Sequence, residues 1–141
     1  MTTVNIQLNK VLAQRIRVWG QTIIQQQGHW GNGEATLGEE ETIIQKLRLN
    51  RSITVSLNEL KVLYVWWLSN CSHSMQDGND VIITQRLIKA FIDLRDILKK
   101  EYSETKDSVV KSRIIDIDKK ILKLKDPQYY EEQGTPIQLS E

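Results

Sequence analysis

Apolar residues are densest in the middle of the chain, where residues 62–68 read Val-Leu-Tyr-Val-Trp-Trp-Leu. Ser56 and Glu59 stand just before this run at the spacing of a capping box, in which the two side chains bond the free amides at a helix start. A helix that is apolar around its whole circumference must be enclosed by other helices or by a partner chain. The pattern therefore predicts a central apolar helix at about residues 57–69.

The first third of the chain predicts two helices. Residues 4–27 carry apolar side chains at the spacing of one helical face. These positions are Leu8, Leu12, Ile16, Trp19 and Ile23, with Val4, Val11 and Val18 beside them. Glycines at residues 28–33 predict a loop, and glutamates at 39–41 followed by basic residues predict a second helix over 39–49. The link at 51–55 is too short to imply a sheet by itself.

The second half of the chain predicts a helical hairpin. Residues 79–126 contain no glycine or proline, yet two apolar stripes within them follow different phases. The first stripe is Leu87, Phe91, Leu94 and Leu98, and the second is Val110, Ile114, Ile117, Ile121 and Leu124. A shift of two residues turns the second stripe by roughly 200° around a continuous helix. We therefore expect an antiparallel hairpin at about 80–125 with its turn at 103–107, and one kinked helix is the alternative.

These elements predict an all-α fold, with four to five helices in a single domain over residues 1–126 and a mostly irregular tail at 127–141. The composition is that of a globular domain, because 40% of the residues are hydrophobic, 26% are charged and the net charge is +1. The longest apolar run is far shorter than the ~18 residues that cross a bilayer. The first residues lack the pattern of a secretory signal and there is one cysteine, so we expect a cytoplasmic protein.

Residues that could bind a metal or support catalysis are few. Cys71, His73, Asp77 and Asp80 are close in the sequence, and His29 is the other histidine. Structural zinc needs four Cys or His ligands, and this chain has three such residues. The glycines spell no phosphate-binding loop, and no strand is predicted that could carry a nucleophile elbow. We therefore expect no metal, no cofactor and no enzymatic activity.

Three tryptophans are candidates for a protein interface. Trp66 and Trp67 project about 100° apart on the central helix, so both cannot point into one narrow seam. Two interpretations stay open, because this helix is either shared between subunits, with one tryptophan emerging, or enclosed inside one monomer. Trp30 lies in the glycine-rich loop and is either a lid on the core or a contact residue.

The isoleucines of the last predicted helix suggest self-association. Ile114, Ile117 and Ile121 keep the four-three spacing of a coiled-coil seam and are flanked by charges of both signs. This spacing predicts a homodimer with a symmetric interface. Packing of the same stripe against the first helix of one monomer is the competing interpretation.

Basic residues gather at two places in the sequence. They are Lys10, Arg15 and Arg17 near the start, and Lys119, Lys120, Lys123 and Lys125 at the end of the last predicted helix. Such clusters can neutralise nucleic-acid phosphates. Lysines near a helix C-terminus are also favoured by the helix dipole alone, which is the structural explanation of the second group.

These patterns indicate a cytosolic, non-catalytic helical module that binds another protein or itself, such as an adaptor, a small regulator or an accessory subunit. The alternative is a helical accessory subunit of a nucleoprotein complex that contacts the nucleic-acid backbone through its basic helix faces. Salt separates the two, because phosphate binding weakens steeply with ionic strength whereas a hydrophobic interface does not.

Overall fold

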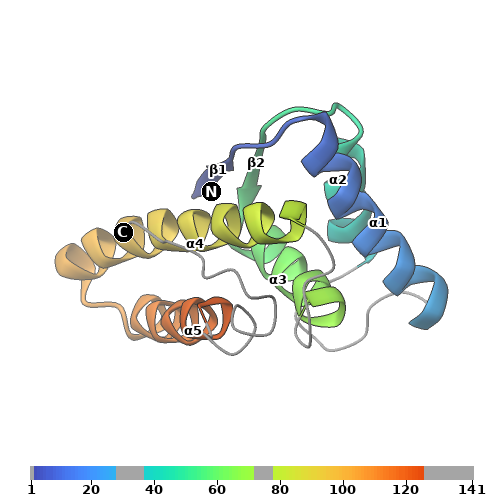
Figure 1. The fold of residues 1–141 in the computed structure, drawn as a ribbon. Coiled ribbons are helices and arrows are strands. Elements are labelled where there is room, and N and C mark those ends of the chain that lie inside the picture. Colours follow the sequence, from blue (N-terminus) through green and yellow to red (C-terminus); the bar gives the residue numbers. More distant parts are fainter. Residues whose placement is uncertain (1, 28–36, 72–77, 126–141) are drawn as a thin grey trace.

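The computed structural model of this chain describes residues 2–27, 37–71 and 78–125. Within these ranges the elements are, in chain order, β1 (Thr3–Ile6), α1 (Lys10–Gln27), α2 (Leu37–Leu47), β2 (Ile53–Ser56), α3 (Leu57–Cys71), α4 (Gly78–Thr105) and α5 (Ser108–Leu124). Figure 1 shows α3 in the middle, between α1 and α2 on one side and α4 and α5 on the other. The prediction of a small helical bundle is confirmed, and one two-stranded sheet is added to it.

The prediction that the first helix covers residues 4–9 is wrong. Residues Thr3–Ile6 form β1, which pairs antiparallel with β2 so that Val4 lies opposite Val55 and Ile6 opposite Ile53. Val4 and Ile6 are buried and their neighbours along the strand are exposed, which is the alternation of a half-buried strand. Residues Thr3–Ile6 form a strand because they pair with β2, which is far away along the chain. Periodicity within one segment cannot reveal such a pairing.

α1 begins one residue after Asn9. The side-chain oxygen of Asn9 accepts a hydrogen bond from the amide of Leu12 at 2.9 Å, as an N-cap residue does. The preceding amide, that of Leu8, donates to the hydroxyl of Ser52 at 3.0 Å. The strand-to-helix connection is thus held to the segment that leads into β2.

α3 starts at the capping box that the sequence contains. The Ser56 amide donates to Glu59 Oε1 at 3.0 Å, and the Glu59 amide donates to Ser56 Oγ at 3.3 Å. Six consecutive residues, Val62 to Trp67, are buried, because α1, α2 and α4 contact different sides of the helix. The helix continues to Cys71, two residues beyond the predicted end at 69.

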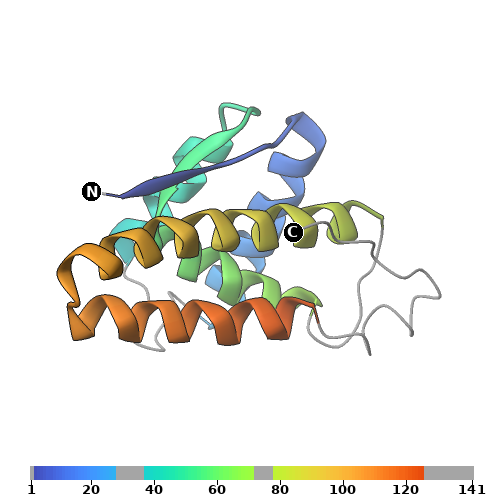
Figure 2. The same ribbon diagram turned by 90° about the vertical axis from the view of Figure 1, so that its left-hand side faces the viewer.

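α4 and α5 lie side by side and antiparallel, as Figure 2 shows. The chain reverses at Lys106, whose φ of 54° is in the left-handed region. Asp107 then caps α5, with its side chain accepting a hydrogen bond from the amide of Val109 at 2.9 Å. This turn lies within residues 103–107, where the two stripes required a change of direction. Across the hairpin, Arg95 Nη1 lies 3.2 Å from Asp118 Oδ1.

The core is centred on large aromatic side chains from three helices. Trp19 of α1, Trp66 and Trp67 of α3 and Phe91 of α4 are all buried. At Gly20, a Cβ atom would stand 2.6 Å from Cη2 of Trp66, so only glycine lets α1 approach α3 this closely.

Some predictions fall outside the described residues. These concern Trp30, His29, His73 and Asp77, the loop at 28–33 and the tail at 127–141. In the part of the chain that the structure describes, no helix has both the length and the apolar character to cross a membrane.

Candidate functional site

Both tryptophans of α3 are enclosed by the chain's own helices. Trp66 and Trp67 are fully buried, so the interpretation that one of them emerges at a subunit interface is wrong. The Trp66 ring packs against Gly20 of α1, and Trp67 Nε1 donates to Thr84 Oγ1 of α4 at 2.9 Å. Helices on both sides cover this pair, so it offers no surface to a partner.

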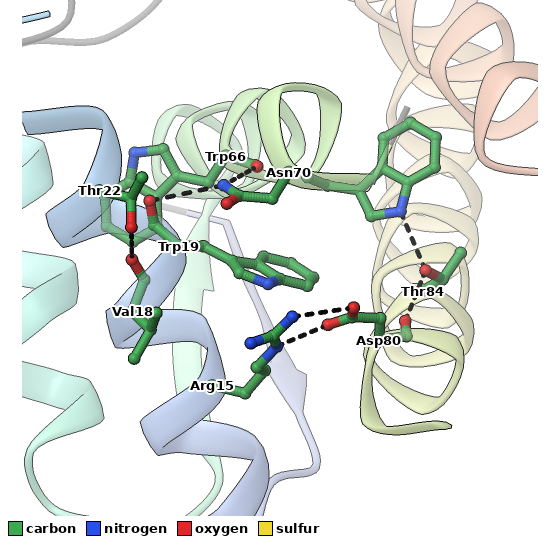
Figure 3. A network of polar contacts seen from close by, with 9 residues as sticks. Arg15, Val18, Trp19, Thr22, Trp66, Asn70, Asp80 and Thr84 are labelled. Carbon is green, nitrogen blue, oxygen red and sulfur yellow. Dashed lines mark hydrogen bonds and ion pairs between the residues drawn. The ribbon is translucent and has the colours of Figure 1, made fainter. Parts of the chain in front are cut away.

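A polar network joins α1, α3 and α4 beside these tryptophans, as Figure 3 shows. Arg15 contacts both carboxylate oxygens of Asp80, with Nε to Oδ1 at 2.8 Å and Nη2 to Oδ2 at 3.1 Å. The Thr84 hydroxyl donates to the backbone oxygen of Asp80 at 2.7 Å and accepts from the Trp67 indole. The Asn70 amide donates to the Trp66 carbonyl at 2.8 Å. These contacts pair polar groups inside the fold. We therefore interpret the network as stabilising the packing of α1, α3 and α4 and not as a binding site.

The isoleucine stripe also belongs to the monomer. Ile117 and Ile121 are buried and Ile114 is partly buried against the core. The stripe faces α4, which is the main neighbour of α5, so the expectation that it forms a dimer seam is wrong. The competing interpretation, in which the stripe packs inside one monomer, named the first helix as its neighbour. The stripe does pack inside the monomer, but its main neighbour is α4 and not α1.

The basic residues do not form one face. Arg15 is paired with Asp80, and Lys120 is buried, with Nζ 3.0 Å from Asp116 Oδ2 and 5.1 Å from the centre of the Tyr64 ring. Arg17 Nη2 lies 3.5 Å from Asn50 Oδ1. The remaining candidates are Lys10 and Lys119, which are exposed, and Lys123 and Lys125, which are partly buried. The two groups are also separated, since α3 lies between α1 and α5 in Figure 1.

Candidate metal ligands do not come together in the described ranges. These ranges hold no group of three or more His, Cys, Asp or Glu that could bind a metal. Cys71 is fully buried, and Asp80 is engaged by Arg15. Both histidines lie outside the described residues, so the candidate group around Cys71 and His73, at which we expected no metal, is not tested as a whole.

One open cleft of about 380 Å³ lies at the start of α3. It is lined by Thr2, Ser56, Leu57, Asn58, Lys61, Leu94, Leu98, Glu101 and Arg113. The Ser56 hydroxyl already accepts the Glu59 amide within the capping box. The lining contains charges of both signs and no histidine or cysteine.

The side of α5 that faces away from α4 carries an unexpected apolar pair. Ile115 is 47% exposed and Leu122 is 72% exposed, and seven residues separate them, so they lie on one line along the helix. We call the exposed side chains on this side the outer face of α5. Its members are Ser108, Lys111, Ser112, Ile115, Lys119 and Leu122, all exposed.

This outer face was not predicted from the sequence, because a stronger apolar pattern lies on the same helix. Ile114, Ile117 and Ile121 form a denser stripe roughly 80–160° around the same helix from Ile115 and Leu122. The seven-residue spacing of Ile115 and Leu122, which places both on one side of a helix, could have indicated this face from the sequence. Only the packing of α5 on α4 decides which of the two stripes is covered.

A second exposed pair lies on α1, where Val11 is 54% and Val18 is 49% exposed. These side chains are smaller than Ile115 and Leu122, and the flanking residues are Lys10 and Gln14. The α1 pair therefore offers less apolar surface than the outer face of α5.

The chain matches no protein-family model, no curated protein and no solved structure. The assignment of function therefore rests on the surface chemistry of this chain alone.

Proposed function

We propose that this chain is a non-catalytic helical module of the cytosol that binds a partner protein through the outer face of α5. The observation that carries the proposal is the exposure of Leu122 and Ile115 on a helix whose opposite side is already buried in the core. Covering an exposed Leu or Ile side chain contributes roughly 1.5–3 kcal/mol, so this pair is a favourable anchor for association.

The chemistry around the anchor also suits a protein interface. Lys111 and Lys119 flank the two apolar residues, and Ser108 and Ser112 extend the face toward the start of the helix. An apolar centre with a polar rim is the usual arrangement at protein interfaces. An amphipathic helix of the partner is the expected occupant, because it buries its own apolar side in the same contact.

The nucleic-acid alternative has less support. Two of its candidate cations, Arg15 and Lys120, are used in ion pairs within the fold. Phosphate binding would therefore depend on residues that are divided between α1 and α5. The apolar Leu122 has no role in contacting a phosphate backbone.

Site-specific photo-cross-linking in the native host tests the proposal. A photoreactive residue at position 119, on the outer face of α5, is expected to form covalent adducts with a protein. The same residue at position 89, on exposed Lys89 of α4, is the matched control and is expected to form few adducts. Leu122→Asp in the position-119 variant should remove the adducts while circular dichroism stays unchanged.

Three results would contradict this proposed function. Equal adducts from positions 119 and 89 would mean that α5 has no specific contact. The absence of adducts from position 119 would mean that its outer face binds nothing under the conditions used. Adducts that contain nucleic acid and disappear between ~50 and ~200 mM salt would favour the alternative function.

A further inference from the structure

We infer that this chain also binds double-stranded DNA, through basic and amide side chains of α1 and of the turn between α2 and β2. We call this set the α1–turn surface, and its members are Lys10, Gln14, Arg17, Gln21, Arg48 and Arg51. The function is additional to the proposed one, because it uses no residue of α5. It also differs from the nucleic-acid alternative considered above, whose cations are divided between α1 and α5.

Two segments that contain no acidic residue lie side by side at this surface. Residues 2–27 and 42–58 together carry six basic residues and no Asp or Glu, although the whole chain has a net charge of only +1. Arg17 Nη2 of α1 lies 3.5 Å from Asn50 Oδ1 in the turn, and the connection into α1 is bonded to Ser52. Figures 1 and 2 both show the start of α1 next to this turn. The fold therefore brings together positive charge from two distant parts of the sequence.

Four of the six cations have no ion pair within the described part of the chain. Arg15 is paired with Asp80, and Lys46 is paired with Glu59. The acidic residues of α2 lie in its N-terminal half, away from the turn. A surface with uncompensated positive charge attracts a polyanion. The unpaired cations are Lys10, Arg48 and Arg51, which are exposed, and Arg17, which is partly buried.

The helix dipole explains only part of this arrangement. Arg48 directly follows the last residue of α2, where the partial negative charge of the helix end favours a cation. Lys10 is the first residue of α1, where the dipole disfavours a cation, and Arg51 lies in the turn beyond α2. Lys10 and Arg51 therefore gain no stability from a helix end, which favours a role in binding.

The spacing on α1 favours duplex DNA as the polyanion. Four members of the surface follow a four-three-four spacing and form one line along the helix, on the side away from its buried residues. They are Lys10, Gln14, Arg17 and Gln21. The major groove of DNA admits an α-helix, and glutamine side chains hydrogen-bond base edges there while lysine and arginine contact phosphates.

Other polyanions suit this surface less well. Single-stranded nucleic acid is bound by stacking its bases on aromatic side chains, and the α1–turn surface contains none. The major groove of an RNA duplex is too deep and narrow for side chains to read. A helix that lies on a membrane presents large apolar residues such as Trp, Phe or Leu. On α1, the exposed apolar residues in the described range are the smaller Val11 and Val18.

The salt dependence of DNA binding tests the inference. Fluorescence anisotropy with a labelled duplex of ~20 base pairs measures the association constant at salt concentrations from ~20 to ~200 mM. Its logarithm should fall linearly with the logarithm of the salt concentration. The slope should be about −3 to −4, because each of the four cations contributes ~0.9 when it neutralises a phosphate. A slope shallower than about −2 would overturn the inference.

Paired substitutions locate the contact. Arg48→Gln with Arg51→Gln should make the slope shallower by about 2 and weaken binding by about tenfold or more at ~50 mM salt. Arg48→Lys with Arg51→Lys keeps both charges and should keep the slope. The matched control is Lys99→Gln with Lys100→Gln, which removes the same charge from exposed residues near the end of α4, away from α1. This control should bind DNA like the wild type.

Three results would contradict binding of DNA at this surface. Equal weakening by the control and by the Arg48–Arg51 variant, with circular dichroism unchanged in both, would mean that only net charge matters. An RNA duplex of the same sequence should bind at least about fivefold more weakly than DNA, and equal binding would overturn the assignment to DNA. Binding to vesicles of phosphatidylcholine and phosphatidylserine, without binding to DNA, would assign the surface to membranes instead.

The outcomes are separable from those of the proposed function. Leu122→Asp on the outer face of α5 should bind DNA like the wild type, because Leu122 is not part of the α1–turn surface. A chain that binds DNA as described but gives no adducts from position 119 would lose the proposed function and keep this one. A chain that gives the adducts but does not bind DNA would overturn this inference alone.

Discussion

Arg15 of α1 and Asp80 of α4 form a two-point ion pair in which the aspartate is completely buried and the arginine is partly exposed. They are 65 residues apart in the sequence and join α1 to α4 beside the indole of Trp19. Two parallel N–H to oxygen contacts fix both the distance and the orientation of the helices. The relationship explains why a basic residue of α1 is unavailable to a phosphate group.

Breaking this pair from one side should be costly. Arg15→Met removes the cation beside a buried carboxylate and is expected to lower the free energy of unfolding by ~3–5 kcal/mol. Arg15→Lys should cost less, because it keeps the charge and loses only the two-point geometry. Denaturant titrations of both variants, and of each with Asp80→Asn, give the coupling energy. A cost below about 0.5 kcal/mol for Arg15→Met would contradict a structural role for the pair.

Gly20→Ala should destabilise the fold, although alanine is the better helix former. Helix propensity alone would favour alanine by ~1 kcal/mol. The added Cβ would stand 2.6 Å from Trp66 Cη2, and overpacking of a rigid ring costs ~1–3 kcal/mol. Gly78→Ala at the start of α4 is the matched control, because nothing lies within 4 Å of its Cβ position. Gly20→Ala should lower the thermal midpoint, whereas Gly78→Ala should raise it. A Gly20→Ala variant with a raised midpoint would mean that α1 and α3 lie further apart than described here.

α3 should be the energetic centre of the domain. Leu63→Ala removes a buried side chain and is expected to cost ~2–5 kcal/mol through lost burial and the cavity that remains. Ser56→Ala removes one of the two capping-box bonds and should cost only ~1 kcal/mol. Chemical denaturation measures both. Similar small effects would mean that α3 is not enclosed as described.

The two faces of α5 should respond differently to the same substitution. Ile117→Glu buries a carboxylate between α5 and α4 and is expected to unfold the chain or cost more than ~3 kcal/mol. Ile115→Glu lies on the outer face and should change monomer stability by no more than about 0.5 kcal/mol. Thermal unfolding in dilute solution, where association is negligible, makes the comparison. If Ile115→Glu destabilised the chain more than Ile117→Glu, the outer face of α5, and not the isoleucine stripe, would be the side that packs on the core.

Local patterns predicted the parts of the fold that depend on neighbouring residues. The capping box at Ser56 and Glu59 forms as its spacing requires. The change of stripe phase between Leu98 and Val110 was accompanied by a turn at Lys106, within the expected segment. Both signals are local, because a cap and a turn are satisfied by backbone groups a few residues away.

The sequence by itself determined that this chain forms a helical bundle with an apolar helix inside it, since helical periodicity and capping depend on residues that are close together in the sequence. The tertiary structure decided which face of each helix is covered. It paired residues Thr3–Ile6 with Ile53–Ser56 as strands, buried Trp66 and Trp67 together, and placed Ile117 on α4. Two apolar stripes on one helix gain the same free energy per area when they are buried. Only the positions of the other helices select which stripe stays exposed, and on α5 they left Ile115 and Leu122 facing outward.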